Sequence, residues 1–70
     1  MRVADILDNV CLPGVVVRIG RVMVEINRIE RYVRVRDGLR TKEYRVTIDP
    51  KYVKHVEAVL RIASLACRKE

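Results

Sequence analysis

The stretch that decides the fold runs from Val22 to Ile48, VMVEINRIERYVRVRDGLRTKEYRVTI, in which apolar and polar residues alternate. A period of two places successive side chains on opposite faces of a β-strand. The alternation predicts strands over residues 21–27, 31–36 and 43–48. Asp37-Gly38 is a turn signal, and we expect its loop to extend to Arg40 or Thr41.

The two faces of these strands differ in chemistry. The residues expected to point inward are Val22, Val24, Ile26, Val33, Val35, Tyr44, Val46 and Ile48. The residues expected to point outward are Arg21, Met23, Glu25, Tyr32, Arg34, Arg36, Glu43, Arg45 and Thr47. The pattern therefore predicts an apolar face that helices cover and a basic face that is open to solvent.

Two further elements are expected upstream of this stretch. Residues 15–19 are rich in β-branched residues and predict another strand, with Gly20 as a tight turn or a bulge. Residues 3–10 carry apolar side chains at helical spacing, which predicts a short helix. That helix should end before Pro13-Gly14, a pair suited to a turn.

Asp49-Pro50 marks the start of a second helix, because an aspartate can cap a helix whose first residue is proline. We expect this helix to run to about Cys67, with Arg68 and Lys69 complementing its dipole. The predicted fold is a single α+β domain over residues 1–70. It is a small antiparallel sheet of about four strands, with a short N-terminal and a longer C-terminal helix on one face, in the order α-β-β-β-β-α.

The core must be built from small side chains, because the chain has no Trp and no Phe. A core of this kind roughly balances the entropy of ordering the chain, so a partner surface or a cross-link is expected to stabilise the fold. Cys11 and Cys67 are the only thiols. We favour two buried free thiols over a disulfide, since most cytosols keep thiols reduced and hyperthermophile interiors are the exception.

The positive charge is concentrated in the predicted sheet. Residues 18–48 hold nine of the 15 Lys and Arg residues and four of the nine acidic residues. Arginine binds phosphate in bidentate fashion and stacks on bases, and a tyrosine can stack on an unpaired base. The sequence therefore predicts a nucleic-acid surface, with structured RNA preferred over DNA, as in a small ribosomal or ribonucleoprotein component. Its candidate residues are Arg21, Tyr32, Arg34, Arg36, Arg40 and Arg45. The alternative is a solvated face on which arginines opposite Glu25 or Glu43 form ion pairs of little consequence.

A second hypothesis is a protein-interaction subunit or a homodimer. The C-terminal helix has a wider apolar surface than one sheet face needs. Its candidate interface residues are Val59, Ile62, Leu65 and Ala66.

Catalytic and metal-binding patterns are missing from the sequence. His55 is the only histidine and has no cysteine at zinc-ligand spacing, and Ser64 lies within a predicted helix. We therefore expect no enzyme activity, metal, cofactor or small-molecule substrate. The chain has no signal peptide pattern and no apolar run long enough to span a membrane, which predicts a cytoplasmic protein without a membrane partner.

One local resemblance favours DNA as an alternative ligand. Residues 24–38 (VEINRIERYVRVRDG), followed by a strand and a helix, resemble the small archaeal chromatin proteins. In that family a basic three-stranded sheet of an SH3-like barrel binds the DNA minor groove, so the resemblance implies binding to duplex DNA. The segment covers about a fifth of the chain, which differs from that family in its N-terminal helix, its few lysines and its lack of tryptophan.

Overall fold

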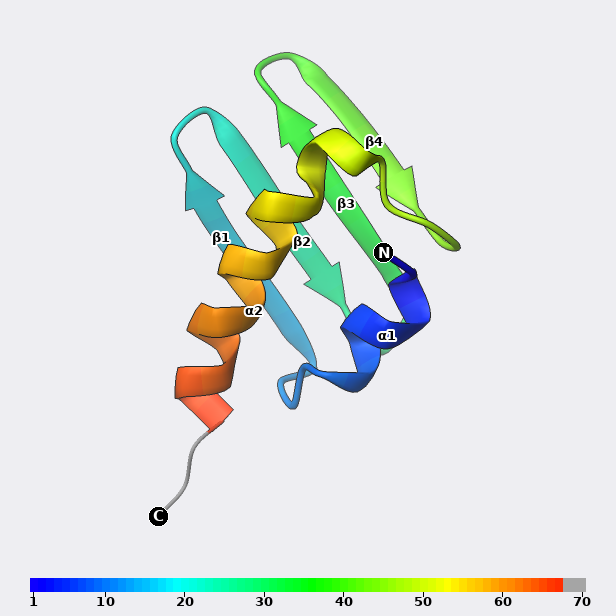
Figure 1. The fold of residues 1–70 in the computed structure, drawn as a ribbon, viewed down its shortest axis with the longest axis vertical. Coiled ribbons are helices and arrows are strands. Elements are labelled where there is room, and N and C mark those ends of the chain that lie inside the picture. The colour runs from blue at the N-terminus through cyan, green and yellow to red at the C-terminus, as the bar shows by residue number, and fades with distance from the viewer. Residues whose placement is uncertain (68–70) are drawn as a thin grey trace.

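The computed structural model, which describes residues 1–67, has one four-stranded antiparallel sheet with two helices on one of its faces (Figure 1). The elements are α1 (Val3–Asp8), β1 (Gly14–Ile19), β2 (Val22–Asn27), β3 (Tyr32–Asp37), β4 (Arg40–Tyr44), a 3₁₀ turn η1 (Pro50–Tyr52) and α2 (Val53–Cys67). This confirms the predicted α+β class and the order α-β-β-β-β-α. The predicted dipole role of Arg68 and Lys69 falls outside the described residues. Neither helix is long and apolar enough, within residues 1–67, to cross a bilayer.

The sheet is a meander in the order β1-β2-β3-β4, so both tight hairpin turns lie at the same end (Figure 1). The β1–β2 turn consists of Gly20-Arg21 and the β3–β4 turn of Gly38-Leu39. Each glycine has a φ of +63° at the first turn position, where two-residue hairpins of type II′ place glycine. The predicted longer loop through Arg40 or Thr41 is wrong, since β4 begins at Arg40.

The fourth strand differs from the prediction at both ends. It ends at Tyr44, not at Ile48, and the chain bends at Arg45 and Val46. Because the bend interrupts the alternation, Val46 is 74% exposed, and the prediction that it points inward is wrong. Ile48, beyond the bend, is buried as predicted. Thr47 forms an isolated bridge with Arg2. This pairing ties the start of α1 to the segment that leads into α2.

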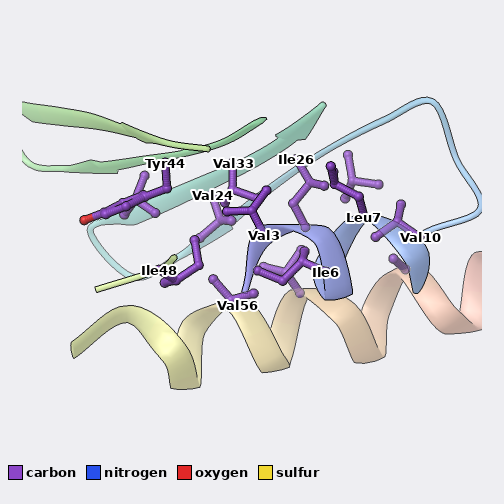
Figure 2. Close-up of a cluster of buried hydrophobic side chains, with 14 of the residues drawn as sticks. Val3, Ile6, Leu7, Val10, Val24, Ile26, Val33, Tyr44, Ile48 and Val56 are labelled. Atoms are coloured by element: carbon purple, nitrogen blue, oxygen red, sulfur yellow. The ribbon is translucent and has the colours of Figure 1, made fainter. Parts of the chain in front are cut away.

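The core lies between the sheet and the two helices (Figure 2). Val24, Ile26 and Val33 of the central strands are fully buried, as are Val56 and Val59 of α2. Each fully buried Val or Ile stabilises the fold by about 1.5–3 kcal/mol relative to exposure. The helical segment starts at Asp49-Pro50 as predicted, but its first turn is the 3₁₀ turn η1, and α2 itself begins at Val53. The Asp49 carboxylate accepts a hydrogen bond from the Lys51 amide at 3.1 Å, with Pro50 at the first position. The core thus fixes which face of the sheet remains open.

A disulfide joins Cys11 to Cys67, and their Cα atoms are 6.0 Å apart. The preference for free buried thiols is therefore wrong, since Cys11 lies in an exposed loop after α1. The bond connects the segment between α1 and β1 to the last turn of α2, 56 positions away. A cross-link is one of the two kinds of support that were expected for the small core, the other being a partner surface.

The disulfide should account for a large part of the stability. On the chain-entropy model, closing a loop of this length stabilises the fold by about 4 kcal/mol. We expect the Cys11→Ser/Cys67→Ser variant to lose up to this amount in free energy of unfolding, measured in denaturant under oxidising conditions. The wild-type protein treated with reductant should match the variant. Equal unfolding midpoints for the oxidised and reduced wild-type protein would contradict a stabilising cross-link.

Candidate nucleic-acid interface

The face of the sheet opposite the helices, here called the outer face, carries the residues that alternate with the core. The pairing register assigns to it Val16, Arg18, Met23, Glu25, Asn27, Tyr32, Arg34, Arg36, Thr41 and Glu43. Directly opposite residues in antiparallel strands share a face and are close enough to interact. The cross-strand neighbours of each arginine therefore decide whether it is paired.

The centre of the outer face is an ion-pair network. Arg34 lies between Glu25 on β2 and Glu43 on β4 in the register. Its Nη1 is 3.2 Å from Glu25 Oε1, and its Nη2 is 3.2 Å from Glu43 Oε1. Arg45 donates from Nε to Glu43 Oε2 at 2.8 Å. For these two arginines the structure shows the ion pairs that the solvated-face alternative describes.

Tyr32 points to the outer face, yet only 6% of it is exposed. The guanidinium carbons of Arg34 and Arg45 lie 4.8 Å and 5.6 Å from the centre of its ring. Its hydroxyl donates to Glu25 Oε2 at 3.2 Å and accepts from Asn27 Nδ2 at 3.4 Å. The ring therefore supports the ion-pair network through cation–π contacts and is not open to a stacking base.

The network also shifts the titration of its members. The hydrogen bond from Arg34 holds the pKa of the Glu43 carboxyl below its ordinary value, and the hydrogen bond from Arg45 acts in the same direction. The hydrogen bond to Glu43 in turn raises the pKa of Arg34. Phosphate contacts by Arg34 would have to replace charge-assisted hydrogen bonds that the residue already makes.

Arg36 differs from Arg34 although the two residues are two positions apart on β3. Its cross-strand neighbours are Met23 and Thr41, which carry no charge. Arg36 lines a surface hollow of about 340 Å³ together with Arg18, Arg21, Met23 and Gly38. Within residues 1–67 the structure shows no ion pair to Arg36 or Arg18. This group of Arg18, Arg21 and Arg36 is called the arginine cluster below.

Arg21 connects the two tight turns. It lies in the β1–β2 turn and its Nη2 reaches within 3.3 Å of the place where a side chain on Gly38 would begin. Its Nε is 3.6 Å from Asp37 Oδ1, a long contact for an exposed pair. Pairs of this kind contribute little, so Arg21 keeps most of its capacity to bind an anion. The arginine cluster therefore lies at the end of the sheet that carries the two tight turns, here called the hairpin end.

Arg40 lies on the face that carries the helices and not on the outer face. In the strand register Arg40 lies opposite Asp37 of β3. The Oδ2 atom of Asp37 accepts a hydrogen bond from the Tyr52 hydroxyl at 2.8 Å, which places this pair of positions on the helix side. With Lys42 and Lys51, Arg40 lines a smaller hollow of about 110 Å³. The basic character thus continues around the hairpin end onto the second face.

The predicted nucleic-acid residues are therefore divided between three places. Arg21 and Arg36 lie in the arginine cluster, Arg34 and Arg45 in the central network, and Arg40 on the helix side. The sequence prediction omitted Arg18, whose place on the outer face follows from the alternation of β1 opposite Met23. The start of β4 at Arg40 could not be read from the sequence, and it decides the face of that residue.

The predicted partner-interface residues are also divided. Val59 is completely buried in the core and takes no part in an exposed surface. Ile62, Leu65 and Ala66 are exposed on the C-terminal half of α2.

The ion-pair network predicts the pH response of Glu43. Because its pKa is lowered in the fold, its contribution to stability is present above the ordinary glutamate pKa and is lost as pH falls through the lowered value. NMR titration of the side-chain carboxyl carbons should show Glu43 titrating below an unpaired glutamate, and Arg34→Gln should raise its midpoint. Arg36→Gln is the matched control and should leave the midpoint unchanged. A midpoint insensitive to Arg34→Gln would contradict the network.

Comparison with known proteins identifies no relative that would help to interpret this geometry. No family model matches the chain, and neither a curated protein nor a solved structure is significantly similar to it. The functional conclusion therefore depends on the placement of the charged side chains.

Proposed function

We propose that this chain is a non-enzymatic protein that binds the phosphate backbone of structured RNA through the hairpin end of its sheet. A ribonucleoprotein component in the cytoplasm is the setting that we favour. The observation that carries the proposal is a separation between two groups of arginines. Arg34 and Arg45 are held in the central ion-pair network, whereas within residues 1–67 the arginine cluster has only the long contact of Arg21 to Asp37. The arginine cluster and the hollow lined by Arg40, Lys42 and Lys51 bring six cations to one end of the molecule. Two carboxylates, those of Asp37 and Asp49, lie beside them.

The balance of charge favours this end over the middle of the sheet. In the central network, Arg34 and Arg45 are matched by the carboxylates of Glu25 and Glu43, so the group has no net charge. Affinity for nucleic acids depends on the cations that neutralise phosphates and release counterions. Unpaired cations gain a new contact on binding, whereas paired ones exchange one contact for another. The proposed contact surface is therefore narrower than the whole basic face.

The burial of Tyr32 supports a structured partner over a single strand. Proteins that bind single strands usually offer aromatic side chains on which successive bases stack. Within residues 1–67, Tyr32 is the only aromatic residue on the outer face, and two guanidinium groups cover its ring. What remains is phosphate recognition by exposed arginines, which suits a helical backbone held in a fixed shape. Duplex DNA has the same backbone chemistry and is the alternative that the experiment must separate.

The proposal predicts the effect of removing the arginine cluster. We expect the Arg18→Ser/Arg21→Ser/Arg36→Ser variant to bind labelled structured RNA more weakly in fluorescence anisotropy. Because this variant lacks three of the cations that neutralise phosphates, the slope of log affinity against log salt should become shallower by about 2 to 3. Labelled single-stranded RNA and duplex DNA, measured in the same salt series, rank the partner classes.

Two controls separate placement from total charge. The Arg2→Ser/Arg31→Asn/Arg61→Ser variant removes the same charge away from the hairpin end, with Asn chosen because residue 31 has a φ of +61°. The Arg34→Gln/Glu43→Gln variant removes one charge of each sign from the network. Both should keep the wild-type salt slope. Equal losses of affinity in all three variants, or no binding by the wild-type protein at low salt, would overturn the proposal.

A further inference from the structure

The two edge strands of the sheet differ in how they are protected. Exposed edges offer unpaired backbone groups to other chains, and proteins commonly block them with charged side chains. Strand β4 has the sequence RTKEY and is protected in this way. Strand β1 has the sequence GVVVRI, with one charge and no proline inside the strand. Its side chains are typical of a central strand, although it lies at an edge.

The free backbone groups of β1 can be identified from the register. Arg28 donates its amide hydrogen to the Pro13 carbonyl at 3.0 Å, so the pair 13–28 is hydrogen-bonded. Hydrogen-bonded pairs alternate along an antiparallel ladder, which makes Val15, Val17 and Ile19 the residues that bond to β2. The amide and carbonyl groups of Gly14, Val16 and Arg18 therefore point away from the sheet.

Exposed apolar side chains accompany this edge. Val16 is 62% exposed on the outer face. On the other face, α2 runs across β1 and β2 (Figure 1). Leu60 and Ser64 line a hollow beside Asn9 at the end of α1. By helical spacing, Ile62 and Ala66 lie on another side of the helix from that hollow, and both are exposed. The edge strand thus has an exposed valine on the outer face and, on the other face, a crossing helix with exposed apolar residues.

We propose that a second copy of this chain pairs with β1 in antiparallel orientation, which joins the two sheets into one of eight strands. The twofold axis passes at Val16, so that Val16 faces Val16 and Gly14 faces Arg18 of the other copy. Each of these outward residues then exchanges hydrogen bonds with its partner. Ile62 and Ala66 of the two α2 helices approach each other across the new strand pair.

The position of Arg18 favours centring the pair on Val16, and the symmetry of the edge favours a second copy of the chain as the partner. Centring the pair on Arg18 would place two arginines directly opposite each other, which is destabilising. Centring it on Val16 separates the two arginines by four positions along the strand and pairs the exposed valines. The same edge is self-complementary, as an interface with twofold symmetry requires. The charged strand β4 offers no equivalent surface, so pairing stops at two copies.

The test is the mass of the nuclease-treated protein at high salt, measured by light scattering during size exclusion. The wild-type protein should be a dimer, and Val16→Lys should be a monomer because a charge at the centre of the pair would face its own copy. Val46→Lys is the matched control, at another exposed valine that lies outside the sheet, and should remain a dimer. A wild-type monomer up to its solubility limit, or a dimer unaffected by Val16→Lys, would overturn the proposal.

A second pair of variants tests the register without relying on a destabilising charge. Hydrogen-bonded partners have Cα atoms about 5.5 Å apart, within the range of a disulfide. Val16→Cys should therefore form a covalent dimer on mild oxidation, as seen on a non-reducing gel. Arg18→Cys should not, because its copies lie four positions apart. Circular dichroism checks that both variants are folded, and cross-linking through Arg18→Cys in place of Val16→Cys would exclude the proposed register.

Discussion

The contact between the valines of α2 and the inner residues of the central strands is the interaction on which the structure depends. Val56 and Val59 are fully buried against a cluster that includes Val24, Ile26 and Val33. No large aromatic ring from Trp or Phe is available to fill this space, so close packing of small β-branched side chains must do so. Once α2 occupies this face, every alternate residue of β2 and β3 must lie on the other. The polarity of the outer face is a consequence of that packing.

Register then determines the chemistry of the outer face. Arg34 and Arg36 are on the same strand and the same face, yet one has glutamates on both sides and the other has Met23 and Thr41. The difference arises from neighbours on other strands and separates a neutral centre from a basic end. A count of arginines in the sheet overstates the surface that can bind a polyanion. Arginines paired with glutamates are included in the count, but they add little to the positive electrostatic potential of the face.

The disulfide and the unpaired edge of β1 lie in the same part of the molecule. The C-terminal half of α2 extends past the sheet, where it has less apolar surface to cover (Figure 1). Cys67 joins this end to the loop before β1, which limits the conformations of the segment that precedes the edge strand. A small core thus receives covalent support on the side where its helix is least buried. Pairing of two copies would cover the same side.

The sequence by itself determined the element order, the inner residues of β2 and β3, and the Asp49-Pro50 helix start. These features depend on local periodicity and on capping by neighbours in the chain. It did not determine the exposure of Val46, the burial of Tyr32 or the face of Arg40. Each of these depends on where a strand bends or begins and on which side chains come from other strands. The disulfide likewise depends on the distance between residues 56 positions apart, which only the tertiary structure decided.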